Sequence, residues 1–160
     1  MSRRLGYTLP PALRAELSQQ DLASRLGLAI PLVTLDEEGR PHPMLLSHVE
    51  VLALGPETIR IVIAAGSRSA ANLAARGHAT LLLIEPAHTF YVKATATGGP
   101  LALGGLARFE LTVTEVLEDA PAAWEEGLAV TGGITYAPVP ALDAAWVRET
   151  LAALRAEPGS

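Results

Sequence analysis

The chain has 160 residues, a formal net charge of −5 at pH 7 and a sequence pI near 5.3. Its basic residues are scattered among more numerous acidic ones, so no basic surface for a nucleic acid is expected. The absence of cysteine excludes a disulfide framework, a thiolate nucleophile and a cysteine-based metal site. This length is typical of one domain with its own core, and we expect a single domain over residues 1–160.

Hydrophobic residues make up 49% of the chain and the mean hydropathy is +0.29. No apolar run approaches the ~18 residues that span a bilayer, so no membrane interaction is expected. The apolar excess indicates additional burial against a partner subunit. Ser2-Arg3-Arg4 is similar to a twin-arginine export signal, but charged residues such as Arg14 and Glu16 follow it instead of an apolar segment. These features predict a cytoplasmic protein.

A helix is predicted from Ala12 to about Leu26, because Pro10-Pro11 precedes it and Gly27 follows it. Its core-facing side is formed by leucines, namely Leu13, Leu17 and Leu22 or Leu26. The run from Leu28 to Leu35 is predicted to be a strand, in which Pro31 indicates an edge position or a kink.

Two extended stretches follow. The chain from His42 to Ala53 is predicted to be extended, and after a turn at Gly55–Glu57 another strand runs from Ile59 to Ala64. Because only a short turn separates them, we expect these strands to form a hairpin. In the first, one face carries Leu45, Val49 and Val51, and the other carries His42, Met44, Leu46, His48 and Glu50. In the second, one face carries Ile59, Ile61 and Ile63.

The stretch Gly66–Ser69 joins this strand to a predicted helix from Ala70 to Arg76. Unpaired backbone N–H groups at a helix start, two hydroxyls and a guanidinium together favour the binding of a phosphate group. A purely structural interpretation is also open, with Ser67 as an ordinary helix N-cap and Arg68 as an exposed side chain.

Gly77 is expected to end this helix, and the apolar run from His78 to Ile84 predicts a central strand buried on both faces. Strands are also predicted at Thr89–Thr97 and Ala107–Glu115, separated by a loop-rich insertion at Gly98–Gly105. Their inward side chains are expected to be Phe90, Val92, Ala94, Ala96, Phe109, Leu111 and Val113. Their outward side chains are expected to be Tyr91, Lys93, Thr95, Thr97, Arg108, Glu110, Thr112 and Thr114.

The C-terminal part is predicted to contain a short helix from Asp119 to Leu128 and an amphipathic helix from Leu142 to Ala156, separated by an irregular stretch. The buried side of the second helix is expected to consist of Leu142, Trp146, Val147, Leu151 and Leu154. About six strands with hairpin connections and few helices predict a mainly β fold, a small antiparallel barrel with flanking helices.

The remaining polar residues define no second site. His42 and His48 share a strand face but are separated by about 20 Å at ~3.3 Å per residue, too far to share a metal ion. His42 is either a rim residue or a ligand contact, and Glu50 is the acidic residue nearest to it in a predicted strand. Ser47 and Ser69 have no base that the sequence reveals, so no hydrolytic triad is expected and no catalytic residue is assigned. The spacing of the histidines predicts no metal site. Trp124 and Tyr136 are most simply packing residues.

The order of these elements resembles the FMN-binding split barrel of the pyridoxamine 5'-phosphate oxidase-like superfamily. The resemblance rests on P-H-P-M-L-L-S-H-V-E-V at Pro41–Val51, on the strand Ile59–Ala64 and on G-S-R-S-A-A-N-L at Gly66–Leu73. The A-T-L-L-L-I strand and the alternating strand after it complete the match, which runs from about Leu28 to Val116. It implies a six-stranded antiparallel split β-barrel, followed by a helical C-terminal extension over about 119–156.

The resemblance also implies a flavin site at a homodimer interface. Transferred by position, Ser67, Arg68 and Ser69 would hold the phosphate of FMN, and Ser47 would assist. Strand residues would contact the flavin ring system, namely Met44, Leu45, Leu46, Val62, Ile63 and Tyr91.

The chain departs from the superfamily pattern in two respects. Ser47 and Ser69 stand where related oxidases often have lysines, which leaves Arg68 as the cation of the predicted phosphate site. The C-terminal arginine-rich signature of true pyridoxamine phosphate oxidases is absent, so that reaction is not expected. The resemblance implies an oxidoreductase that passes hydride or electrons through FMN to a small-molecule acceptor. Two alternatives are a non-catalytic flavin-binding or sensing protein and a reductase that uses the deazaflavin F420.

Overall fold

The computed structural model describes residues 1–86 and 88–157. Its strands are β1 Ser2–Gly6, β2 Ala29–Leu35, β3 Pro41–Ser47, β4 Val51–Ala53, β5 Thr58–Ala64, β6 His78–Glu85, β7 His88–Ala96, β8 Leu101–Leu103 and β9 Leu106–Asp119. Its α-helices are α1 Pro11–Glu16, α2 Arg68–Arg76 and α3 Ala145–Arg155. Short 3₁₀ turns lie at Leu22–Arg25, His48–Glu50 and Ala123–Glu125.

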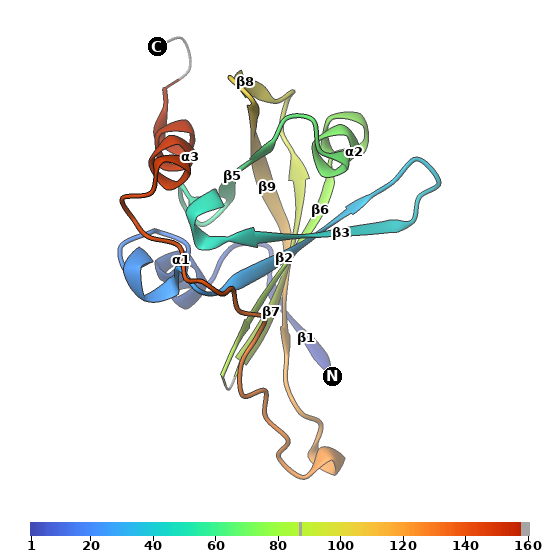
Figure 1. Cartoon of the computed structure of the whole chain (residues 1–160). Helices are drawn as coiled ribbons and strands as arrows, with labels where there is room; N and C mark the ends of the chain where they lie inside the picture. Colours follow the sequence, from blue (N-terminus) through green and yellow to red (C-terminus); the bar gives the residue numbers. More distant parts are fainter. Residues whose placement is uncertain (87, 158–160) are drawn as a thin grey trace.

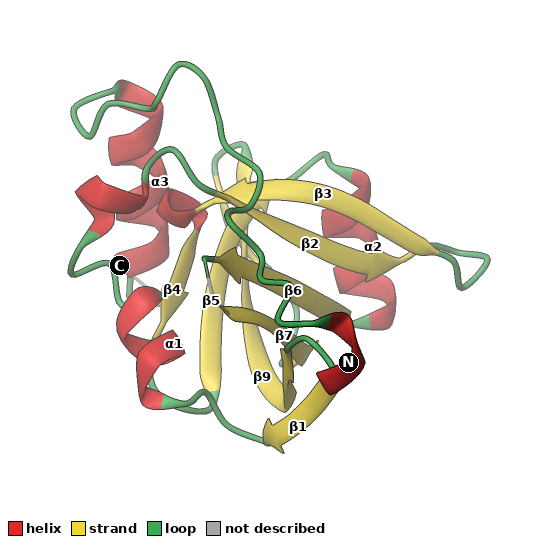
Figure 2. Cartoon of the chain, turned by 90° about the horizontal axis from the view of Figure 1, so that it is seen from below, coloured by secondary structure: helices red, strands yellow, loops and turns green. Residues whose placement is uncertain are grey.

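The strands form one antiparallel sheet in the order β3-β2-β6-β7-β9-β5-β4, and β1 and β8 pair with β9. The two ends of this path, β3 and β4, are consecutive in the chain and are joined by the turn His48–Glu50. The sheet therefore curls around an enclosed core, as Figures 1 and 2 show. With β3 and β4 counted as one bent strand, the path has the six strands that were predicted. The mainly β split barrel is confirmed.

Alternating apolar side chains fill the inside of the barrel. β5 directs Ile59, Ile61 and Ile63 inward, and β9 adds Phe109 and Leu111. All five are buried, as the two-residue alternation predicted. Burying a side chain of this size stabilises the fold by about 1.5–3 kcal/mol.

Helix α3 covers the outer face of β5 and β9 (Figure 1). Its buried stripe includes Val147 and Leu154, and Leu154 packs against Val62 of β5. Leu142 and Trp146, which were also predicted to be buried, are about half exposed. Leu142 precedes the first residue of the helix, and Trp146 lies beside the stripe, so this part of the prediction is wrong.

β2 and β6 separate toward one end of the barrel, where a C-terminal segment joins the sheet. β2 pairs with β6 only over Leu32–Thr34. Before this paired stretch, Ala29 N–H donates to Ile134 O, at a distance of 2.9 Å. Segment 131–136 thus lies beside the start of β2. β2 is an internal strand, so the predicted edge position of Pro31 is wrong. The strand accommodates Pro31 because this residue lies just before the residues that pair with β6.

The predicted helix Ala12–Leu26 is interrupted. α1 ends at Glu16, and Gln19 has a φ of 64°, which an α-helix does not accommodate. The Gln19 amide donates to Val51 O at 3.1 Å, so a tertiary contact accompanies the left-handed residue. The predicted leucines are nevertheless buried, because a second turn at Leu22–Arg25 continues the core-facing side.

Three further boundaries differ from the prediction. The extended stretch 42–53 is broken by the turn His48–Glu50, so only β4 forms the hairpin with β5. The predicted helix Asp119–Leu128 is reduced to one turn at Ala123–Glu125, because β9 continues to Asp119 and pairs there with β7. The insertion 98–105 contains β8, which folds back on β9.

Within residues 1–86 and 88–157, no helix is long and apolar enough to cross a membrane.

Candidate functional site

The turn after β5 has the geometry of a helix start. Ser67 N–H donates to Ala64 O at 3.0 Å, and α2 begins at Arg68. Ser67 Oγ accepts from Ala70 N–H at 3.1 Å, so Ser67 is the N-cap of α2. The first-turn N–H groups of Arg68 and Ser69 have no acceptor within the helix. The structural interpretation of Ser67 is thus confirmed, and two backbone donors remain available at the same point.

Arg68 is exposed, whereas Ser69 is buried with its side chain turned into the fold. Arg68 is therefore the residue of the predicted phosphate set that can reach a ligand outside the chain. The N-terminus of a helix favours a negative charge by about 0.3–1 kcal/mol when it is exposed. Together with the guanidinium, it favours the binding of one phosphate group at this turn.

A cavity of about 420 Å³ adjoins this turn, between the start of α2 and the hairpin β8–β9. Gly66, Ser67 and Ala70 line it from one side, and Pro100 and Phe109 line it from the other. The lining is apolar apart from Ser67 and the backbone. The cavity can hold an uncharged group next to the helix start, but it offers no second cation for a phosphate.

Ser47, the last residue of β3, lies away from the turn of α2. Its backbone pairs with Ala29, whereas α2 contacts β2 through the hydrogen bond from Asn72 to Thr34 at 3.0 Å. Thr34 is five positions along β2 from Ala29, or about 16 Å at the rise of a strand. Ser47 N–H donates to Glu50 Oε2 at 2.6 Å, and burial raises the pKa of Glu50. Within one chain, Ser47 therefore belongs to the turn after β3, away from this contact.

Leu45 and Tyr91 lie on the same outer face of the sheet. Leu45 pairs with Pro31, and Leu82 pairs with Tyr91. Pro31 and Leu82 each lie one residue beyond the Leu32–Leu81 pair that joins β2 to β6. A row of outward side chains thus crosses four strands, from the exposed Leu45 to the half-buried Tyr91.

The other predicted ring contacts are enclosed by the chain itself. Leu46 and Ile63 point into the barrel core, with Met44 packed against it. Val62 points to the outer face, but α3 covers it and leaves it 1% exposed. The side chains of Leu46, Val62 and Ile63 are thus inaccessible to a ligand in this arrangement, while Leu45, Arg68 and Tyr91 are accessible.

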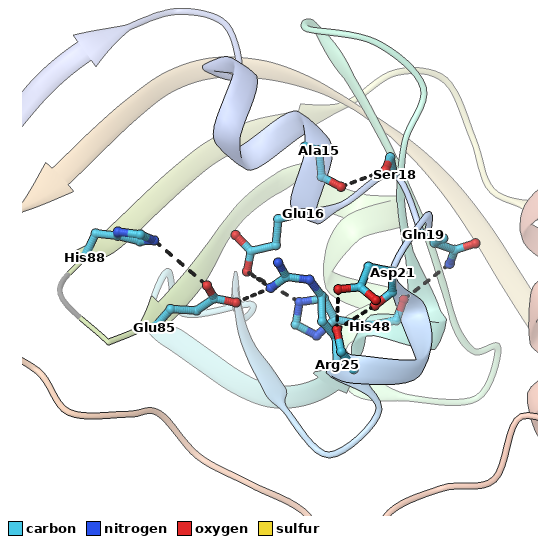
Figure 3. A network of polar contacts seen from close by, with 10 residues as sticks. Ala15, Glu16, Ser18, Gln19, Asp21, Arg25, His48, Glu85 and His88 are labelled. Atoms are coloured by element: carbon cyan, nitrogen blue, oxygen red, sulfur yellow. Dashed lines mark hydrogen bonds and ion pairs between the residues drawn. The ribbon is translucent and has the colours of Figure 1, made fainter.

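A polar cluster links α1, the turns Leu22–Arg25 and His48–Glu50, and the end of β6 (Figure 3). His48 Nε2 lies 3.6 Å from Glu16 Oε1, and Arg25 Nη1 lies 3.3 Å from the same oxygen. Arg25 also bonds to Glu85 of β6. Burial alone would raise the pKa of Glu16, but the hydrogen bonds with His48 and Glu85 and the Arg25 charge outweigh it and lower that pKa. Burial and the nearby Glu16 raise the pKa of Glu85.

Sequence reasoning missed this cluster, because its members come from four separate elements without a shared spacing. Among residues 1–86 and 88–157, no group of three or more histidine, aspartate or glutamate side chains is arranged to hold a metal ion. The cluster is instead an arginine shared by two carboxylates, with a histidine beside one of them.

Comparison with known proteins gives matches to solved structures. No family model matches the sequence, and no curated protein matches it. An FMN-binding protein from Syntrophomonas wolfei subsp. wolfei aligns over 69% of this chain and 91% of its own, with 15% identity and a TM-score of 0.51. A structure described as a putative pyridoxamine 5'-phosphate oxidase from Lactobacillus delbrueckii aligns over 71% of this chain and 98% of its own, with 14% identity and a TM-score of 0.54.

At these identities the likeness concerns the fold, and it agrees with the strand order and the curled antiparallel sheet described above. The chain therefore has the split-barrel fold that these two structures share.

Proposed function

We propose that this chain binds FMN as a homodimer and serves as an oxidoreductase that transfers electrons to a small molecule. The fold supports the flavin part of this proposal, because the two solved structures above share it and one is described as an FMN-binding protein. The observation that carries it is the turn at the start of α2. There the exposed Arg68 guanidinium and the free N–H groups of Arg68 and Ser69 converge.

In this proposal Arg68 and the first-turn N–H groups hold the phosphate of FMN. A charge-assisted hydrogen bond from a guanidinium is about twice as strong as a neutral one, so Arg68 would supply the largest single contribution. Bound FMN would supply the redox chemistry, and the protein would position it. Because Ser69 is buried and Ser47 lies elsewhere in the chain, we expect weaker FMN binding than in proteins with lysines at these positions.

The second copy would cover the outer face of β3, β2 and β6. This face carries Leu45, Pro31, Val33 and Leu82, which are exposed or half-buried in the single chain. Contiguous apolar surface of this kind is typical of an interaction site. The flavin ring would lie between the two copies near Leu45, since α3 covers Val62.

Titration with FMN and with riboflavin, which lacks the phosphate, tests the proposal. We expect FMN to bind more tightly than riboflavin, and Arg68→Ala to weaken FMN binding about tenfold while leaving riboflavin binding unchanged. Arg14→Ala, an exposed arginine on α1, is the matched control. Equal binding of FMN to the Arg68→Ala and Arg14→Ala variants would refute the phosphate site, and a preference for F420 over FMN would assign the deazaflavin instead.

A further inference from the structure

A second cavity lies at the opposite end of the barrel from the turn of α2. It has a volume of about 390 Å³ and lies between the hairpin β6–β7, the end of β9 and the segment 120–130, which projects below the barrel in Figure 1. Ala96, at the far end of β7, donates its N–H to Gly77 O just after α2. His88 lines the cavity eight residues earlier, or about 26 Å away along the strand. The two cavities are therefore separate.

The lining of this cavity combines an apolar wall with a few polar groups. Ile84, Pro121, Leu128 and Val130 form the apolar wall. Cavities that bind small molecules have this composition, and a volume of roughly 300–1,000 Å³ is typical of them.

Thr89 supplies a polar group that the chain leaves unpaired. Its residue surface is 5% exposed, and its Oγ1 has no hydrogen-bond partner among the residues that the structure describes. Thr89 lines the cavity and lies on the same strand face as Tyr91, two residues further along. An unsatisfied buried hydroxyl destabilises the fold, because the group has lost its hydrogen bonds to water. A ligand with a hydrogen-bonding group opposite Thr89 would recover this loss.

The charges around the cavity select against anions. Tyr91 OH donates to Asp119 Oδ2 at 2.7 Å, and the N-terminal amine lies 3.0 Å from Asp119 Oδ1. The Tyr91 hydrogen bond lowers the pKa of Asp119, so this carboxylate stays ionised at neutral pH. Glu125 adds a second carboxylate to the lining, and His88 adds an imidazole. The ammonium group of Met1 also lines the cavity and is paired with Asp119, so an anionic ligand would meet one carboxylate, Glu125, that forms no ion pair among the described residues.

We propose that this cavity binds a small uncharged molecule with an apolar body and a carbonyl or hydroxyl group that pairs with Thr89 Oγ1. The proposal does not depend on FMN, because none of the residues that line this cavity belongs to the turn of α2. It assigns Tyr91, which the sequence placed among the flavin contacts, to a separate ligand site within the single chain.

Menadione, an uncharged two-ring diketone, is a suitable probe, and its sulfonated naphthoquinone analogue is the matched anion. In amide NMR spectra of the full chain, we expect menadione to shift the signals of Thr89, Leu128 and Val130 saturably and to leave Arg68 unchanged. The sulfonated compound should bind at least tenfold more weakly. Thr89→Val, which keeps the shape and removes the hydroxyl, should weaken menadione binding about tenfold.

The same variant has a second readout. Thr89→Val removes an unpaired buried hydroxyl, so the ligand-free protein should unfold at a higher temperature than the native chain. Thr80→Val, a half-buried residue on the outer face of β6, is the control for both measurements. The proposal is overturned if menadione causes no saturable shift at these residues, if the anion binds equally well, or if Thr89→Val and Thr80→Val bind menadione alike. None of these results bears on the binding of FMN at Arg68.

Discussion

Arg60 of β5 donates from Nη1 to Leu154 O at the C-terminus of α3, at 2.9 Å. The same guanidinium forms two hydrogen bonds to Glu110 Oε1, at 2.9 and 2.8 Å. Arg108, beside it on β9, donates to Ala153 O at 2.9 Å. Two guanidinium groups thus meet the carbonyl end of one helix, where a positive charge is favourable. This contact fixes α3 over the outer face of β5.

Replacing Arg60 with methionine should therefore loosen α3. The variant keeps the length of the side chain but leaves Leu154 O without this donor, and we expect the free energy of unfolding to fall by about 2 kcal/mol. Chemical denaturation measures the change, and Arg148→Met, at an exposed position of the same helix, is the control. Equal stability of the two variants would show that the helix is held by its apolar stripe alone.

The C-terminal segment depends on a close approach at Gly133. A Cβ atom at this position would lie 2.8 Å from Ile84 O, whereas a Cβ at Gly132 would meet no atom within 4 Å. Gly133→Ala should displace segment 131–136 from β6 and lower the free energy of unfolding by about 2 kcal/mol. Gly132→Ala should change it by less than about 0.5 kcal/mol. If both substitutions are tolerated, the segment does not pack on β6 in solution.

The buried cluster at Glu16 predicts a pH dependence of stability. Its neighbours lower the pKa of Glu16 in the folded protein below the usual value of a glutamate. A carboxyl group with a lowered folded pKa stabilises the fold above its unfolded pKa, and this contribution is lost as the pH falls through the folded pKa. Glu16→Gln should therefore be less stable than the native chain at neutral pH, and the difference should shrink below about pH 4.5. A difference that stays constant down to pH 3 contradicts the assignment.

The outer sheet face predicts the effect of a charge on self-association. Leu45 and Leu54 are 44% and 45% exposed, but only Leu45 lies on the face of β3 and β2 that we assign to the second copy. Leu45→Glu should yield monomers in sedimentation experiments, while Leu54→Glu should behave like the native chain. A native chain that is itself monomeric at all accessible concentrations would remove the proposed interface.

Much of the fold could be predicted from local pattern. Alternation identified the inward residues of β5, β7 and β9, because a strand with one face in the core must repeat its apolar residues every second position. Gly77 marked the end of α2 correctly, and the structural interpretation of Ser67 marked its N-cap, since an N-cap hydroxyl and a left-handed C-cap are local requirements. The helix was predicted from Ala70 and begins at Arg68. The superfamily resemblance added the split barrel, which no single stretch shows by itself.

The errors have tertiary causes. Arg108 lies on the outward face of β9, as predicted, but only 3% of it is exposed, because α3 covers that face and accepts its hydrogen bonds. The helix after Pro11 ends early since Gln19 bonds to the backbone of a distant turn. In the candidate site, the superfamily resemblance placed Ser47 beside Arg68. Within the chain, Ser47 ends β3 and belongs to the turn before β4, whereas Arg68 begins α2. Local pattern carries no information about which element covers an outer face.

The binding of FMN at the start of α2 is tested most directly by amide NMR of the full chain during an FMN titration. We predict the largest shifts at Gly66–Ala70, led by the N–H groups of Arg68 and Ser69, with their loss in Arg68→Ala. FMN that binds while these amides stay unchanged, or that does not bind at all, would contradict the phosphate site at this helix start.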